Sequence, residues 1–137
     1  MGMFSHLILL VEDEALILLD VETALTEAGF EVICAKDAAE ALAHFDADPA
    51  RFKGLVTDIR LGPGKSGWDI ARHVREIAPG MPVIYMSGDS AADWHSRGVP
   101  GSVMIQKPFV IAQIITGLST LLNNMPPVQS DDSSALA

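Results

Sequence analysis

The sequence predicts an α/β protein in which a five-stranded parallel sheet is covered by helices on both faces. Five short apolar runs alternate along the chain with longer segments of helical periodicity, which is the pattern of successive βα units. The apolar runs contain few polar residues, as expected of strands that are buried on both faces. Right-handed crossovers then favour doubly wound strand orders such as 2-1-3-4-5.

The first two βα units occupy roughly the first third of the chain. Residues 7–11 are uniformly apolar and predict a buried strand, and the following helix is expected to stop at Gly29. Residues 30–35 predict a second strand with more alternation. Residues 37–40 resemble a capping box and start a second helix that runs to about Asp48. The apolar spacing of the first helix comes from Ile17, Val21, Ala24 and Ala28.

The third unit contains the longest predicted loop. Residues 54–58 predict a strand, and residues 61–67 hold three glycines and a proline, which are typical of a loop. The helix after this loop is expected to end at Pro79-Gly80. Its apolar positions are Ile70, Val74 and Ile77.

The last two units complete one domain, expected over residues 5–124. Residues 82–86 and 102–106 predict the fourth and fifth strands, and residues 91–97 a short helix between them. Residues 125–137 are rich in Ser, Asp and Pro and are expected to be a disordered tail. The final helix has an apolar stripe of Ile111, Ile115, Leu118 and Leu122.

Composition excludes several classes of function. With nine basic and eighteen acidic residues among 137, the net charge of −9 argues against a nucleic-acid surface, and Trp68 and Trp94 are expected to pack or to face a protein partner. No apolar run approaches the about 20 residues that span a bilayer, and a secretory signal is not expected. The single cysteine, Cys34, cannot form an internal disulfide, which favours a cytoplasmic location.

Polar residues follow four of the predicted strands. Glu12 and Asp13 come after the first, Asp58 ends the third, Ser87 follows the fourth and Lys107 follows the fifth. The carboxyl ends of parallel strands meet at one edge of the sheet, where such folds bind ligands. Clustered carboxylates suit Mg²⁺, while lysine and serine suit phosphoryl oxygens. We therefore expect phosphoryl chemistry there, with a carboxylate as nucleophile.

This ordered set resembles the receiver domain of two-component response regulators, a single-domain, chemotaxis-regulator-like form with a flavodoxin-like sheet. The resemblance covers about residues 5–124. It implies that Asp58 is phosphorylated by a histidine kinase or phosphotransfer protein. It also implies that Ser87 and Lys107 contact the phosphoryl oxygens. Mg²⁺ would be held by Glu12, Asp13, Asp58 and the backbone carbonyl of Arg60.

Two features depart from the family pattern. The loop after Asp58 is one residue longer than usual, and the switch position three residues before Lys107 holds Met104 instead of an aromatic residue. Ser87 and Met104 are the expected switch residues, and methionine is expected to give a weaker coupling than a ring. The chain is read as a stand-alone receiver that relays phosphate or acts through an unidentified protein target. The fifth helix is a candidate homodimer surface.

Other functions remain open from the sequence. A phosphatase or mutase could use the same aspartyl-phosphate chemistry, but haloacid-dehalogenase-type enzymes carry a second Asp where this chain has Arg60. A phosphate-independent interaction module would not need Asp58, Lys107 and the acidic pair. We therefore expect no enzymatic activity beyond self-phosphorylation and autodephosphorylation.

Overall fold

The computed structural model describes residues 6–107 and 111–124. Its centre is a five-stranded parallel sheet with the order β2-β1-β3-β4-β5, which confirms the predicted 2-1-3-4-5 arrangement. The strands are β1 (Leu7–Val11), β2 (Glu31–Ala35), β3 (Phe52–Asp58), β4 (Val83–Ser87) and β5 (Val103–Gln106). The helices are α1 (Ala15–Glu27), α2 (Ala38–Ala47), α3 (Gly67–Ile77), α4 (Trp94–Arg97) and α5 (Ile111–Asn123), with short 3₁₀ turns η2 (Pro49–Arg51) and η3 (Ala91–Asp93).

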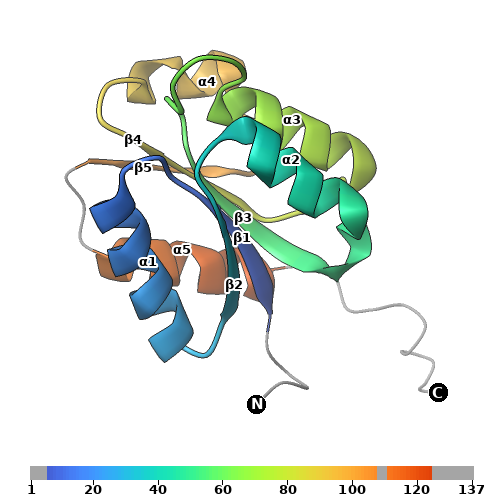
Figure 1. Ribbon diagram of the computed structural model, residues 1–137, viewed down its shortest axis with the longest axis vertical. Coiled ribbons are helices and arrows are strands. Elements are labelled where there is room, and N and C mark those ends of the chain that lie inside the picture. Colours follow the sequence, from blue (N-terminus) through green and yellow to red (C-terminus); the bar gives the residue numbers. More distant parts are fainter. Residues whose placement is uncertain (1–5, 108–110, 125–137) are drawn as a thin grey trace.

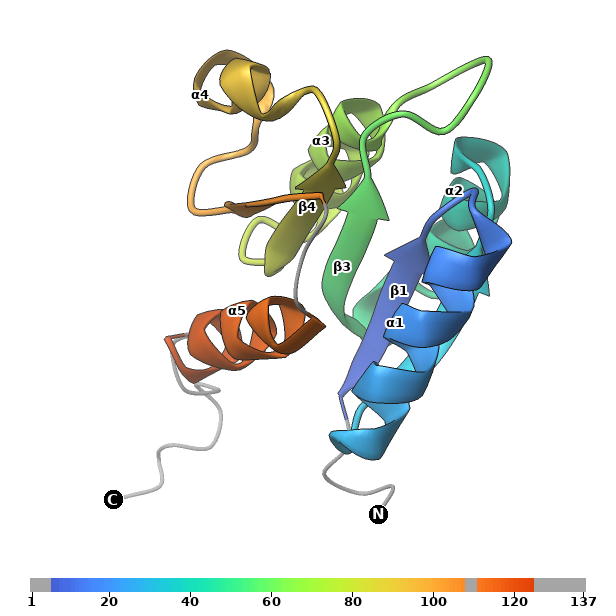
Figure 2. The same ribbon diagram turned by 90° about the vertical axis from the view of Figure 1, so that its left-hand side faces the viewer.

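Helices cover both faces of the sheet (Figures 1 and 2). One face packs against α1 and α5 through an aliphatic cluster that includes Val21, Val56 and Leu118. The other packs against α2 and α3 through a cluster that includes the rings of Phe45, Trp68 and Tyr85. Within the described ranges no helix is long and apolar enough to cross a bilayer.

Most differences between prediction and structure are shifts of one or two residues at element ends. The start of the third strand is one such shift, and its cause is clear. It begins at Phe52 instead of residue 54, because Phe52 is buried and pairs with Leu7 before a register shift in the ladder. The expected fourth helix divides into η3 and α4. The predicted tail, 125–137, lies outside the described residues.

The helix α3 also begins earlier than the sequence pattern predicts. Ser66 accepts a hydrogen bond from the backbone N–H of Asp69, and the Asp69 side chain accepts one from the backbone N–H of Ser66. This reciprocal capping box starts the helix at Gly67, which sequence analysis had assigned to the loop. A Cβ atom at Gly67 would lie 2.1 Å from the carbonyl oxygen of Asp58, so glycine lets the helix start directly against the end of β3.

Candidate functional site

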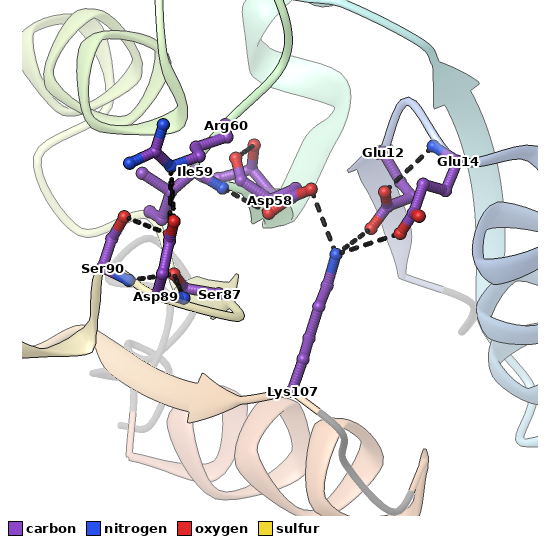
Figure 3. Close-up of polar contacts among 10 residues, drawn as sticks. Glu12, Glu14, Asp58, Ile59, Arg60, Ser87, Asp89, Ser90 and Lys107 are labelled. Atoms are coloured by element: carbon purple, nitrogen blue, oxygen red, sulfur yellow. Dashed lines mark hydrogen bonds and ion pairs between the residues drawn. The ribbon is translucent and has the colours of Figure 1, made fainter.

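The parallel sheet brings the carboxyl ends of β1 and β3 side by side, and with them three carboxylates. Glu12 follows β1 and is fully buried, Asp13 is exposed, and Asp58 is the buried last residue of β3. One carboxylate oxygen from each lies within 4.8 Å of the others. Figure 3 shows Glu12 and Asp58 reaching this edge from two different strands, although they are far apart in the sequence.

Asp58 is held by its own neighbours in the chain. Its Oδ1 accepts a hydrogen bond of 2.8 Å from the backbone N–H of Ile59, and the Thr57 hydroxyl donates to its carbonyl oxygen. Its other carboxylate oxygen, Oδ2, accepts from Lys107 Nζ at 3.1 Å. The carboxylate is therefore oriented by a backbone donor on one oxygen and a cation on the other.

Lys107 links the two buried acids. Its Nζ lies 3.1 Å from Glu12 Oε1 and 3.1 Å from Asp58 Oδ2, with Glu14 Oε1 farther away at 3.7 Å. The backbone N–H of Lys107 donates to the carbonyl oxygen of Ser87, which continues the β4–β5 ladder to the site. The ammonium group thus lies between two carboxylates, and Figure 3 shows its side chain extended toward them.

Burial dominates the electrostatics of these groups. It raises the pKa of Glu12 to about 7, even though Lys107 and the backbone N–H of Glu14 act in the opposite direction. Burial also raises the pKa of Asp58, against the effect of Lys107. Burial alone would lower the pKa of Lys107, but Asp58 and Glu12 together raise it. One ammonium group does not fully compensate two buried carboxylates.

The donor set fits a hard divalent cation. Three carboxylates at one edge supply the oxygen ligands that Mg²⁺ prefers, and a cation there would relieve the cost of charging Glu12 and Asp58. The adjacent cavity of about 370 Å³ is lined by Glu14, Asp58, Arg60, Gly88, Asp89 and Lys107. It is large enough to hold a phosphoryl group with its water shell.

Ser87 lies at the same edge, but its hydroxyl oxygen is engaged by the following turn. Ser87 Oγ accepts from the backbone N–H of Ser90 at 2.7 Å and of Asp89 at 3.2 Å. The exposed side chain of Arg60 forms an ion pair with Asp89, which joins the loop after β3 to the loop after β4. These bonds use Ser87 Oγ as an acceptor, so they hold the side chain against the turn without using its hydroxyl hydrogen.

Two participants were not assigned a role from the sequence. Glu14 contributes a third carboxylate around Lys107, and Asp89 pairs with Arg60. Their positions just after β1 and β4 were the available signal. Met104 is partly buried in the cluster on the α2–α3 face and lies in register with Tyr85 of β4.

Known proteins are similar to this chain in fold and in sequence. Residues 8–119 match the family model described as the response regulator receiver domain. A response regulator receiver protein from Sinorhizobium medicae WSM419 is 46% identical with a TM-score of 0.86, covering 90% of this chain and 98% of that one. Chemotaxis protein CheY4 of Vibrio cholerae is 26% identical with a TM-score of 0.75, covering 85% and 98%.

Longer proteins also match. The transcriptional regulatory protein PrrA of Mycobacterium leprae is 30% identical over 138 residues, which cover 99% of this chain and 58% of that protein. CusR of Escherichia coli K12 is 30% identical over 117 residues, covering 84% and 50%. The chain thus spans little more than half the length of these curated relatives.

Proposed function

Because the chain belongs to the response regulator receiver domain family, we propose that Asp58 is the residue through which it accepts a phosphoryl group. The protein is a phosphoryl-accepting signalling switch of a two-component system. The observation that carries the assignment of Asp58 is that its carboxylate pairs with Lys107 Nζ and lies beside two further carboxylates at the edge of the sheet.

The geometry around Asp58 suits attack by a carboxylate on phosphorus. In the proposed step a carboxylate oxygen forms a bond to phosphorus, and the bond from phosphorus to the donor breaks with its electron pair leaving on the donor. The product is an acyl phosphate. Lys107 favours the ionised carboxylate against the effect of burial and then neutralises a phosphoryl oxygen, while the Ser87 hydroxyl donates to another.

We assign Mg²⁺ to Glu12, Asp13 and Asp58, with the backbone carbonyl of Arg60 completing the protein ligands. The clustered carboxylate oxygens support this assignment. When bound, the ion would offset the negative charge of the incoming phosphoryl group. The same charge balance would favour self-phosphorylation from a small donor and later hydrolysis of the acyl phosphate.

Intact-mass spectrometry after treatment with acetyl phosphate and Mg²⁺ tests the site. Wild type is expected to gain one phosphoryl group, and Asp58→Ala none. Excess chelator and Asp13→Ala are both expected to abolish or strongly reduce labelling. Asp46→Ala removes an exposed aspartate and is the matched control. Full labelling of Asp58→Ala would refute the assignment.

The proposed donor is a histidine kinase or phosphotransfer protein, which must cover the edge that α1 borders to bring its histidine to Asp58. Two leucines of α1, Leu16 and Leu19, are 78% and 56% exposed beside that edge. Exposed large apolar side chains next to a reacting group favour a protein contact. We propose that these leucines bind the donor, in the cytoplasm as the sequence predicts. The downstream target, homodimer formation and a stand-alone role remain predictions.

Comparison of a small phosphoryl donor with a protein donor tests whether Leu16 and Leu19 bind the protein donor. Replacement of Leu16 and Leu19 by serine is expected to slow transfer from a phosphorylated phosphotransfer protein at least tenfold and to leave labelling by acetyl phosphate unchanged. Ile77→Ser is the control, because Ile77 is an exposed apolar residue at the far end of α3. Equal slowing by Ile77→Ser, or no slowing by the leucine variants, would contradict this contact.

A further inference from the structure

The chain between β4 and β5 is joined to β4 by a buried hydrogen bond. Tyr85 of β4 is fully buried, and its Oη accepts from the backbone N–H of Val99 at 3.0 Å. The ring of Tyr85 packs against the buried ring of Trp68 with 4.7 Å between centroids. Tyr85 therefore has a fixed position, and it fixes Val99 of the α4–β5 connection in turn.

Two further hydrogen bonds join the α4–β5 connection to α4. The indole Nε1–H of Trp94 in α4 donates to Ser102 Oγ at 2.9 Å, and Ser102 Oγ donates to the Val99 carbonyl oxygen at 2.6 Å. Gly98 lets the backbone cross the indole, because a Cβ atom there would lie 2.3 Å from Trp94 Cδ1. Both backbone groups of Val99 are thus used, the N–H by Tyr85 of β4 and the carbonyl oxygen by Ser102, to which Trp94 of α4 donates.

The proposed phosphate-contacting serine belongs to the same set of bonds. Ser87 lies two residues after Tyr85 on β4, and its Oγ accepts from the backbone N–H of Ser90. Ser90 in turn accepts from the backbone N–H of Asp93, which begins the turn into α4. The covalent chain joins Tyr85 to Ser87 and Asp93 to Trp94. Together with these chain links, the hydrogen bonds close a ring, residues 85–102, that runs from Tyr85 and Ser87 through Ser90 and Trp94 to Val99 and back to Tyr85.

Met104 does not take part in the bonds of this ring. It lies in register with Tyr85 on the neighbouring strand, so their side chains point to the same face of the sheet. The aromatic residue of this pair is on β4, two residues from Ser87, and not on β5. The family pattern places the aromatic residue three residues before Lys107, so that pattern does not point to Tyr85.

We propose that Tyr85 and Trp94, through Val99 and Ser102, transmit phosphorylation of Asp58 to the surface around α4. This inference rests on the proposed function, and it assigns the switch to residues 85–102 instead of position 104. Movement of Ser87 toward a phosphoryl group breaks its bond with Ser90. Val99 and Ser102 are buried, so movement of only part of the segment would leave a buried polar group of one of them without a hydrogen bond. The segment therefore moves as a unit.

Backbone NMR with Mg²⁺ and beryllofluoride, a stable phosphoryl mimic, tests the ring. In wild type, amides of residues 89–102 are expected to change along one common titration curve. In Tyr85→Phe and in Ser102→Ala, changes at residues 89 and 90 persist, whereas those at residues 94–102 fall by more than half. Met104→Leu behaves as wild type. Ser96→Ala is the matched control, since Ser96 Oγ donates to Asp93 O in the same segment but outside the ring.

The outcomes separate this inference from the proposed function. Full changes at residues 94–102 in both ring variants, or an equal loss in Ser96→Ala, would overturn the ring as the route of transmission. Changes near Asp58 in wild type without any at residues 94–102 would do the same. An absence of change around Asp58 itself in wild type would overturn the proposed function, and the inference with it.

Discussion

The ion pairs of this protein differ in burial more than in distance. Lys36 lies 2.6 Å from Glu40 and Arg72 lies 2.6 Å from Asp69, yet these four side chains are 36–68% exposed. Lys107 lies farther from its partners, at 3.1 Å, but is only 17% exposed and contacts the fully buried Glu12. The shortest pairs are thus solvent-exposed, and the longer ones are in the site.

The difference shows in the pKa values of the acids. On the surface, the hydrogen bond from Lys36 lowers the pKa of Glu40, so ionisation of Glu40 is favoured by folding. In the site, burial raises the pKa of Glu12 to about 7 despite Lys107. The exposed pairs stabilise the fold slightly. In the site, burial of charged carboxylates costs folding free energy, and a bound cation can reduce that cost. A short distance alone is therefore a poor guide to the importance of an ion pair.

The largest expected effect is that of Lys107→Met. Removal of the ammonium group leaves the buried Glu12 and Asp58 carboxylates without a cation, which is expected to lower the free energy of unfolding at pH 8 by about 3 to 5 kcal/mol. Urea denaturation without Mg²⁺ measures it. The loss is expected to shrink at pH 5, where protonated Glu12 needs no counter-charge. Lys36→Met is the control, and an equal loss in that variant would erase the distinction between the two kinds of pair.

The pH dependence of stability isolates Glu12. Its folded pKa is raised from 4.5 to about 7, so its contribution is fully present below pH 4.5 and is lost as the pH rises through 7. The shift corresponds to roughly 3 kcal/mol. The difference in unfolding free energy between wild type and Glu12→Gln is expected to change by this amount between pH 4.5 and 8 without Mg²⁺. A constant difference would show that Glu12 is not perturbed by burial.

Asp58→Asn is expected to act in the opposite direction to Lys107→Met, with a smaller effect. Burial raises the pKa of Asp58, so its charged form opposes folding at pH 8. A neutral amide removes that cost, and Lys107 still pairs with Glu12. The free energy of unfolding should rise. Asp46→Asn, which removes an exposed acid paired with His73, serves as the comparison. A less stable Asp58→Asn protein would contradict the expected sign.

The smallest effect is expected for Arg72→Ala, which breaks the exposed pair with Asp69. Such pairs are worth less than about 1 kcal/mol, and labelling of Asp58 by acetyl phosphate should not change. Thermal unfolding and intact mass check both statements. A loss comparable to that of Lys107→Met would mean that distance, and not burial, determines the strength of these pairs.

The amino-acid sequence by itself determined the order of the βα units and the edge at which the polar residues meet. Apolar runs and helical spacing are local patterns, and parallel strands bring their carboxyl ends to one edge whatever the details of packing. Glu12, Asp13, Asp58 and Lys107 could therefore be expected together. The capping box of Ser66 and Asp69 is also a local pattern, because the two residues are three apart in the sequence, and it could predict the start of α3.

Only the tertiary structure decided how these residues interact. That Lys107 lies between Glu12 and Asp58, and that the pKa of Glu12 rises to about 7, depends on how much water the surrounding elements exclude. The bond from Val99 to Tyr85 joins residues on a strand and a distant loop, and no spacing rule predicts it. Burial and long-range hydrogen bonds arise from the packing of the whole chain, because desolvation of one group depends on side chains from every neighbouring element.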